Sequence, residues 1–173
     1  MPSLADGEHL MTPSMIEIFV DQDWDEMNRV HTTAEQFLLK QHFGPETINR
    51  CAMVVCELVE NSLKYGCFRN KEEQVKASIL LSPSQVTVEV TNPSNIYILG
   101  NLREFDRTIQ WVRGFQDPFE AYMKRIKAIS HEALTLDKSG LGIARIAYEG
   151  RAAIDFIIDE NYTLTVSAVI PIS

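Results

Sequence analysis

Three side chains that could do chemistry share one face of an expected helix. In the segment CELVENSLKYG, Glu57, Asn61 and Lys64 fall within about 60° of one another at 100° per residue. A carboxylate, a carboxamide and an amine in one stripe suit magnesium–nucleotide chemistry: the carboxylate orients a nucleophile, the amide oxygen binds Mg²⁺ and the amine meets phosphate. The spacing is equally typical of a solvated helix face with a Glu60–Lys64 pair, so it leaves both interpretations open. The opposite side carries the expected core residues Cys51, Val55, Leu58, Val59 and Ser62.

A second candidate segment lies near the C-terminal end of the sequence. Gly140 and Gly142 immediately precede an apolar run with helical spacing that ends near Tyr148. Glycines there let backbone N–H groups approach an anion at a helix N-terminus, where the helix dipole also favours negative charge. A plain turn uses the same residues, so this segment alone is weak evidence for phosphate binding.

The two segments together resemble a known family. The chain reads ELVENSLKYG on a helix, then a hairpin, a variable loop, SGLGIARI at a helix start and a hairpin ending in Ile-Pro. This order resembles the GHKL (Bergerat-fold) ATPases, and within them it is more similar to the small stand-alone anti-sigma-factor serine kinases than to sensor histidine kinases. The resemblance covers residues 15–171, and the two motifs in this order are far more specific than either alone.

The resemblance implies a role for each matching residue, with ATP and Mg²⁺ as cofactors. Glu57 matches the catalytic glutamate of the family, which polarises the attacking hydroxyl or water. Asn61 matches the asparagine that ligates Mg²⁺, and Lys64 matches a basic position that meets phosphate. Gly140 and Gly142 match the second glycine box, which wraps the β- and γ-phosphates at a helix N-terminus.

The segment that would bind adenine departs from the family pattern. Where the family carries its first glycine box, D-x-G-x-G, residues 91–96 read TNPSNI. Asn92 can still accept a hydrogen bond from the adenine amino group through its carbonyl oxygen, but Pro93 and the missing glycines predict a stiffer, bulkier loop. The family also uses a threonine on a late strand near adenine. Thr163 and Thr165 both lie there and spacing does not choose between them; we take Thr165 as the candidate.

Composition and charge exclude several classes of protein. The chain has 173 residues and is 45% hydrophobic, which is enough for one domain with a core. Its net charge of −8 opposes phosphate contacts, so we expect no nucleic-acid partner. No stretch approaches the roughly 20 apolar residues that span a bilayer, and the N-terminus lacks a signal-peptide pattern, so we expect no membrane association and a cytoplasmic protein. The three cysteines indicate neither a disulfide framework nor a metal motif.

The expected elements predict an α+β fold. Helices grouped between hairpins favour a two-layer sandwich, with a mixed, mostly antiparallel sheet and helices on one face. A polar lead is expected at residues 1–14, and one ATPase-like domain at residues 15–173. The expected strands are Met15–Val20, Gln74–Leu81, Gln85–Thr91, Ala152–Asp159 and Tyr162–Ile170, and the expected helices cover residues 21–43, Pro45–Tyr65 (ended by Gly66), Arg103–Val112, Asp117–Ser130 and Gly140–Tyr148.

A long insertion at residues 92–139 contains two of these helices. Loops of this length are usually functional or carry their own structure. The second of its helices has an apolar stripe, which could close over a nucleotide, dock a partner or pack onto the sheet. The stripe consists of Phe119, Tyr122, Met123, Ile126 and Ile129.

Two functions follow from these observations. The first is an ATP-dependent serine/threonine protein kinase of a bacterial partner-switching pathway, which phosphorylates a small antagonist protein and also holds a sigma factor or another effector. The second is a degenerate, non-catalytic Bergerat-fold module that sequesters a protein partner, which the altered first glycine box favours. Members of this family often form homodimers, so the resemblance makes a homodimer one possible oligomeric state for either function.

Overall fold

The structure is a computed structural model that describes residues 14–131 and 140–172. Most of the expected polar lead and the segment 132–139, which includes Lys138 and Ser139, lie outside the described residues. None of the described helices is long and apolar enough to cross a membrane. In chain order the elements are β1 (Met15–Val20), the 3₁₀ turn η1 (Trp24–Glu26), α1 (Met27–Lys40), α2 (Pro45–Tyr65), β2 (Val75–Leu81), β3 (Gln85–Asn92), α3 (Ile98–Arg113), α4 (Pro118–His131), α5 (Leu141–Tyr148), β4 (Ala153–Ile158) and β5 (Leu164–Pro171).

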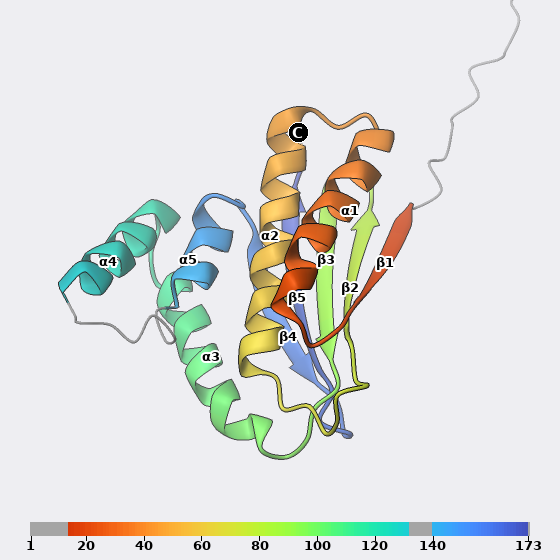
Figure 1. Ribbon diagram of the computed structural model, residues 1–173. Coiled ribbons are helices and arrows are strands. Elements are labelled where there is room, and N and C mark those ends of the chain that lie inside the picture. The colour runs from red at the N-terminus through yellow and green to blue at the C-terminus, as the bar shows by residue number, and fades with distance from the viewer. Residues whose placement is uncertain (1–13, 132–139, 173) are drawn as a thin grey trace, which may run out of the picture.

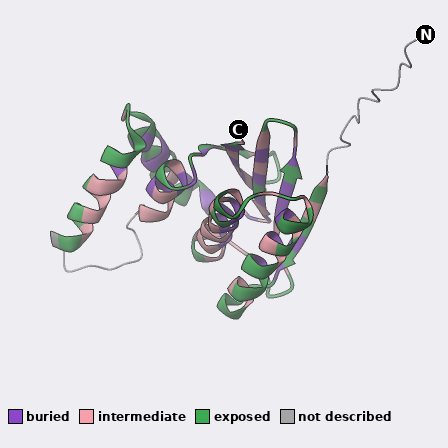
Figure 2. Ribbon diagram, turned by 90° about the horizontal axis from the view of Figure 1, so that it is seen from above, coloured by how far each residue is buried: buried purple, intermediate pink, exposed green. Residues whose placement is uncertain are grey.

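The sheet has the strand order β1-β2-β3-β5-β4, and every pairing among the described residues is antiparallel. Helices α1 and α2 lie side by side on one face of it, while α3, α4 and α5 continue the helical layer beyond α2 (Figure 1). The core lies between the helices and the sheet (Figure 2). The predicted α+β two-layer fold with helices on one face is therefore confirmed, while the sheet, expected to be mixed, is antiparallel at every described pairing.

Helix α2 forms where the sequence predicts it. Pro45 occupies the first turn, where its missing N–H costs nothing. The helix ends at Gly66, whose N–H donates to the Ser62 carbonyl oxygen at 2.9 Å. The face opposite Glu57 is buried against the sheet as expected, including Val55 and Val59. Burial of this apolar face fixes the rotation of α2 and thereby directs Glu57, Asn61 and Lys64 away from the core.

Strand alternation decides which side chains face the helices. In β3, Val90 and Asn92 are buried on the helical side, whereas Thr91 lies between them on the other face. In β5, Leu164 and Val166 are buried on the helical side, and Thr165 alternates with them. The ends of β3 and β5 therefore present Asn92 and two aliphatic side chains to the helical layer.

The insertion forms two helices, but the first begins earlier than Arg103. Helix α3 starts at Ile98 because Asn95 organises the preceding turn: its side chain accepts from the Tyr97 N–H at 3.0 Å and donates to the Cys67 carbonyl oxygen at 3.0 Å. A side chain that acts across the fold in this way gives no periodic signal in the sequence.

Helix α4 packs mainly against α5 and α3 rather than on the sheet. Two residues of its apolar stripe, Phe119 and Tyr122, lie against Tyr148 of α5, with ring centroids 5.1 and 5.3 Å apart. The stripe was expected to close over a nucleotide, dock a partner or pack onto the sheet, and the last of these is wrong: its aromatic residues cover α5.

We expect Gly150→Ala to destabilise the fold by about 2 kcal/mol. A Cβ on Gly150 would lie 2.3 Å from the Ile146 carbonyl oxygen and 2.7 Å from Val54 Cγ2. Since the first of these is a backbone atom at the end of α5, it cannot move without disturbing the helix. Urea unfolding measures the effect. Gly44→Ala is the control, because a Cβ there meets nothing within 4 Å; equal stability of the Gly150 variant and the wild type would contradict the prediction.

Candidate functional site

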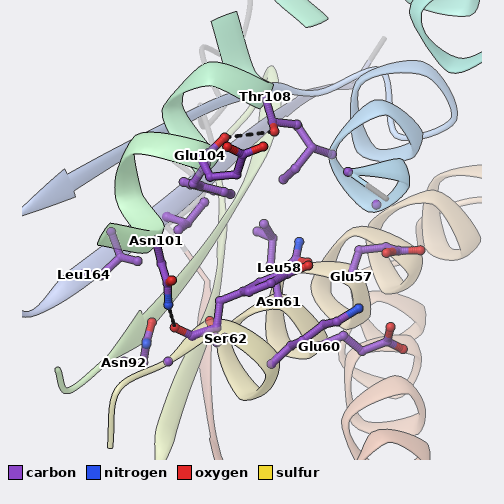
Figure 3. Close-up of a pocket in the computed structure, with 18 of the residues that line it drawn as sticks. Glu57, Leu58, Glu60, Asn61, Ser62, Asn92, Asn101, Glu104, Thr108 and Leu164 are labelled. Atoms are coloured by element: carbon purple, nitrogen blue, oxygen red, sulfur yellow. Dashed lines mark hydrogen bonds between the residues drawn. The ribbon is translucent and has the colours of Figure 1, made fainter. Parts of the chain in front are cut away.

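A pocket of about 770 Å³ opens between α2, α3, α5 and the ends of β3 and β5 (Figure 3). This volume is in the range of pockets that bind small molecules and cofactors. Six of the seven site residues predicted from the sequence line it: Glu57, Asn61, Lys64, Asn92, Gly140 and Gly142.

The two predicted motifs meet at the N-terminus of α5. A Cβ on Gly142 would lie 2.6 Å from Glu57 Oε2 and 3.7 Å from Asn61 Nδ2. Gly140, the N-cap, adopts a left-handed conformation with φ of 59°, which favours glycine. The backbone at the start of α5 therefore lies directly against the carboxylate and the amide of α2. This arrangement brings an anion-favouring helix end beside a candidate metal ligand.

Two amides of the pocket have unused hydrogen-bonding capacity. Asn61 Nδ2 is buried and has no hydrogen-bond partner among the described residues. Asn92 is only 1% exposed, and neither Oδ1 nor Nδ2 has a partner there. A buried amide that is left unpaired costs free energy, so native proteins rarely retain one. Both amides indicate a bound polar group.

Glu57 also makes a contact that the sequence does not predict. Its Oε1 accepts from Arg145 Nη1 at 2.8 Å, while Arg145 Nε donates to Glu149 Oε2 at 2.9 Å. These hydrogen bonds, the one to Glu149 first, raise the pKa of Arg145 against the opposing effect of burial, so the guanidinium stays charged. Tyr122 Oη donates to Glu149 Oε1 at 3.0 Å, which extends the network to α4.

Sequence reasoning could have found part of this network. Arg145 lies within the SGLGIARI segment, and its spacing to Glu149 is a helical i,i+4 pair. The contact with Glu57, 88 residues away, depends on the packing of α5 against α2. Tyr122 joins this hydrogen-bond network only because α4 packs on α5, so no local sequence pattern could have predicted its contact with Glu149.

The pocket is acidic despite its two cations. Its lining includes the carboxylates of Glu57, Glu60 and Glu104 against Lys64 and Arg145. Burial, followed by the nearby charge of Glu57, raises the pKa of Glu60. A triphosphate entering such a pocket meets an excess of negative charge. We therefore expect any nucleotide to bind together with a divalent cation.

Thr165 is the predicted site residue that the structure does not bring into the pocket. Its hydroxyl is 2.9 Å from the Thr91 hydroxyl, its cross-strand neighbour on the face of the sheet opposite the helices. Leu164 and Val166 line the pocket instead. The reason is the two-residue period of a strand, which directs adjacent side chains to opposite faces. Thr163 precedes β5 and does not line the pocket either.

We expect Arg145→Ala to weaken Mg-dependent ATP binding about tenfold, because removing the guanidinium leaves the acidic lining without one of its two cations. Arg145→Lys should recover only part of the loss, since an ammonium cannot bridge two carboxylates with the same geometry. Calorimetric titration measures the effect. Arg151→Ala is the control, because Arg151 is exposed and pairs with Glu46; equal losses in Arg145→Ala and Arg151→Ala would contradict the prediction.

No family model matches the sequence, and no curated protein matches it. Among solved structures, a similar chain occurs in the crystal structure of the SiaB-SiaC complex from Pseudomonas aeruginosa, with a TM-score of 0.68 and 15% sequence identity over 90% of this chain and 88% of that chain. At this identity the likeness concerns the fold: the chain has the architecture of a protein crystallised in complex with another protein.

Proposed function

We propose that the protein is a Mg-ATP-dependent serine/threonine protein kinase that regulates a small antagonist protein in a partner-switching pathway. The observation that carries this proposal is the meeting of Glu57, Asn61 and Gly142 at the N-terminus of α5, inside a pocket with unpaired buried amides. A solvated helix face, the competing interpretation of the α2 stripe, does not require another helix end to pack against it.

The residues at this end of the pocket fit Mg²⁺ and phosphate. The Asn61 amide can offer an oxygen to a cation, because its nitrogen and oxygen exchange by a half-turn and the buried nitrogen has no partner among the described residues. The N-terminus of α5 would bind phosphate oxygens through its N–H groups, and the exposed Lys64 also lines the pocket. When bound, Mg²⁺ would neutralise the charge that develops on the transferred group.

Glu57 is placed to act as the base. Its Oε1 is held by Arg145, whereas Oε2 faces Gly142 at the start of α5. In the proposed step a serine or threonine hydroxyl oxygen forms a bond to the γ-phosphorus as the bond to the ADP oxygen breaks, and Glu57 takes the hydroxyl proton. Arg145 thereby serves to fix the orientation of the carboxylate.

A protein substrate agrees with the surroundings of the pocket. Ile96, Tyr97 and Leu99 are exposed apolar residues, and Ile98 and Gly100 beside them line the pocket. A structurally similar chain was crystallised in the SiaB-SiaC complex, so this fold is known to occur in an assembly of two proteins. Both observations support a protein partner next to the nucleotide.

A second candidate function is a non-catalytic module that binds a partner. Two observations favour it: the ion pair occupies one oxygen of Glu57, and residues 93–96 replace the glycines of the first glycine box. Under this proposal the fold and the partner surface remain, while phosphoryl transfer is lost.

Calorimetric titration with ATP, with and without Mg²⁺, distinguishes the two. If the protein is a kinase, we expect Mg-dependent ATP binding both in the wild type and in Glu57→Ala. The wild type should also form ADP slowly, with water as the phosphoryl acceptor, and Glu57→Ala should abolish this hydrolysis. Binding without ADP formation would favour the non-catalytic module. No binding at millimolar ATP would overturn the kinase.

A further inference from the structure

The end of the pocket away from Glu57 contains Asn92, a buried amide, with Ser62 and Asn101 beside it (Figure 3). Asn92 lies beside Leu164 in the close-up view, and Glu57 lies on the other side of Leu58 and Asn61 (Figure 3). A Cβ on Gly66, at the end of α2, would be 3.0 Å from Asn92 Nδ2, so Asn92 lies at the end of the helix. Glu57 is nine residues earlier, which is about 13 Å along the axis. The apolar residues that line the pocket include Leu58, Ile98, Leu102, Phe105, Leu164 and Val166.

Asn92 differs from the neighbouring amides in having both polar atoms available. Asn101 Nδ2 donates to the Tyr65 carbonyl oxygen at 3.0 Å, and both polar atoms of the Asn95 side chain are engaged in the turn before α3. In Asn92, neither the amide oxygen nor the amide nitrogen has a hydrogen-bond partner among the described residues, although the residue is only 1% exposed. The polar edge of a planar ligand held by the apolar residues that line the pocket would therefore be recognised mainly through hydrogen bonds to this one amide.

We infer that Asn92 makes this pocket accept purines with either an amino or an oxo group at position 6, so that GTP binds as well as ATP. This inference rests on the proposed nucleotide site. An amide presents one acceptor and one donor, and a half-turn exchanges them without changing its shape. Adenine offers the N6 amino group and the N1 acceptor, and guanine offers the O6 acceptor and the N1–H donor. Each base edge thus matches the donor and the acceptor of Asn92, and two hydrogen bonds form once the buried amide turns toward the base.

A carboxylate at the same position would discriminate between the two bases. Aspartate has no hydrogen to donate when ionised, so it can accept from the adenine amino group but opposes the guanine O6. A site that leaves buried polar groups unpaired with one ligand rejects that ligand strongly. Asn92→Asp should therefore weaken GTP binding at least tenfold more than ATP binding.

The experiment measures the Kd of ATP, GTP and UTP by calorimetry in the presence of Mg²⁺. For the wild type we expect ATP and GTP to agree within about fivefold, a difference of about 1 kcal/mol, and UTP to bind more weakly because its smaller ring fills less of the pocket. Asn101→Asp is the matched control: it is the same amide-to-carboxylate change in the pocket lining, at an exposed residue, and should affect ATP and GTP equally.

The outcomes separate this inference from the proposed function. Binding of ATP with GTP at least 100-fold weaker in the wild type would overturn the inference and leave the kinase standing. Failure of both nucleotides at millimolar concentration would overturn the nucleotide site itself. Because the wild-type ratio alone decides the question, the conclusion does not depend on whether the Asn92→Asp variant folds.

Discussion

Asn61→Ala is expected to weaken Mg-dependent ATP binding about 1,000-fold, or about 4 kcal/mol. Asn61 lies next to Glu57 near the start of α5, and its buried amide nitrogen has no partner among the described residues. Alanine removes the oxygen proposed to bind Mg²⁺. The acidic lining then repels the triphosphate without compensation. Calorimetric titration with ATP in excess Mg²⁺ measures the loss.

Two comparisons make this prediction specific. Asn61→Asp keeps an oxygen ligand at the same place and should retain Mg-dependent binding, although the added negative charge weakens binding when Mg²⁺ is absent. Chelation of Mg²⁺ with EDTA should reduce the wild type to the level of Asn61→Ala. Retained micromolar binding by Asn61→Ala would show that the residue is not the metal ligand.

Gly142→Ala is expected to lower Mg-dependent ATP turnover about 100-fold while leaving the stability of the fold unchanged or slightly higher. The added Cβ would lie 2.6 Å from Glu57 Oε2. Because this atom is the end of a flexible side chain, the structure accommodates the methyl group by moving the carboxylate. Moving the carboxylate weakens its hydrogen bond with Arg145, and the preference of the helix for alanine over glycine, about 1 kcal/mol, offsets that loss. The displaced Glu57 then no longer meets the attacking hydroxyl.

The matched control for this variant is Gly100→Ala. Gly100 is a helical glycine that also lines the pocket, but a Cβ there meets nothing within 4 Å. It should gain stability without losing turnover. ADP formation and urea unfolding, measured on both variants, give the contrast. If Gly142→Ala were as active as Gly100→Ala, Glu57 would not be the base.

Much of the fold could be predicted because its signals are local. The bounds of β1 and α2 agree with the sequence prediction, since an apolar strand and a proline-to-glycine helical segment need no distant information. Helix α3 begins five residues before the expected Arg103, because the Asn95 side chain bonds to Cys67 across the fold. The surface that α4 covers could not be predicted, because amphipathic spacing shows that a helix has a partner but not which one.

The sequence by itself determined that Glu57, Asn61 and Lys64 share a face, because the angle between residues of one helix is fixed by their spacing. It also placed Gly140 and Gly142 at a helix start. Only the tertiary structure decided that Gly142 touches Glu57, that Arg145 holds the same carboxylate, that Asn92 is buried without a partner among the described residues, and that Thr165 faces away from the pocket. These relations join residues of different elements. They are set by the packing of α5 on α2 and by the register of β3 and β5, which depend on the whole core.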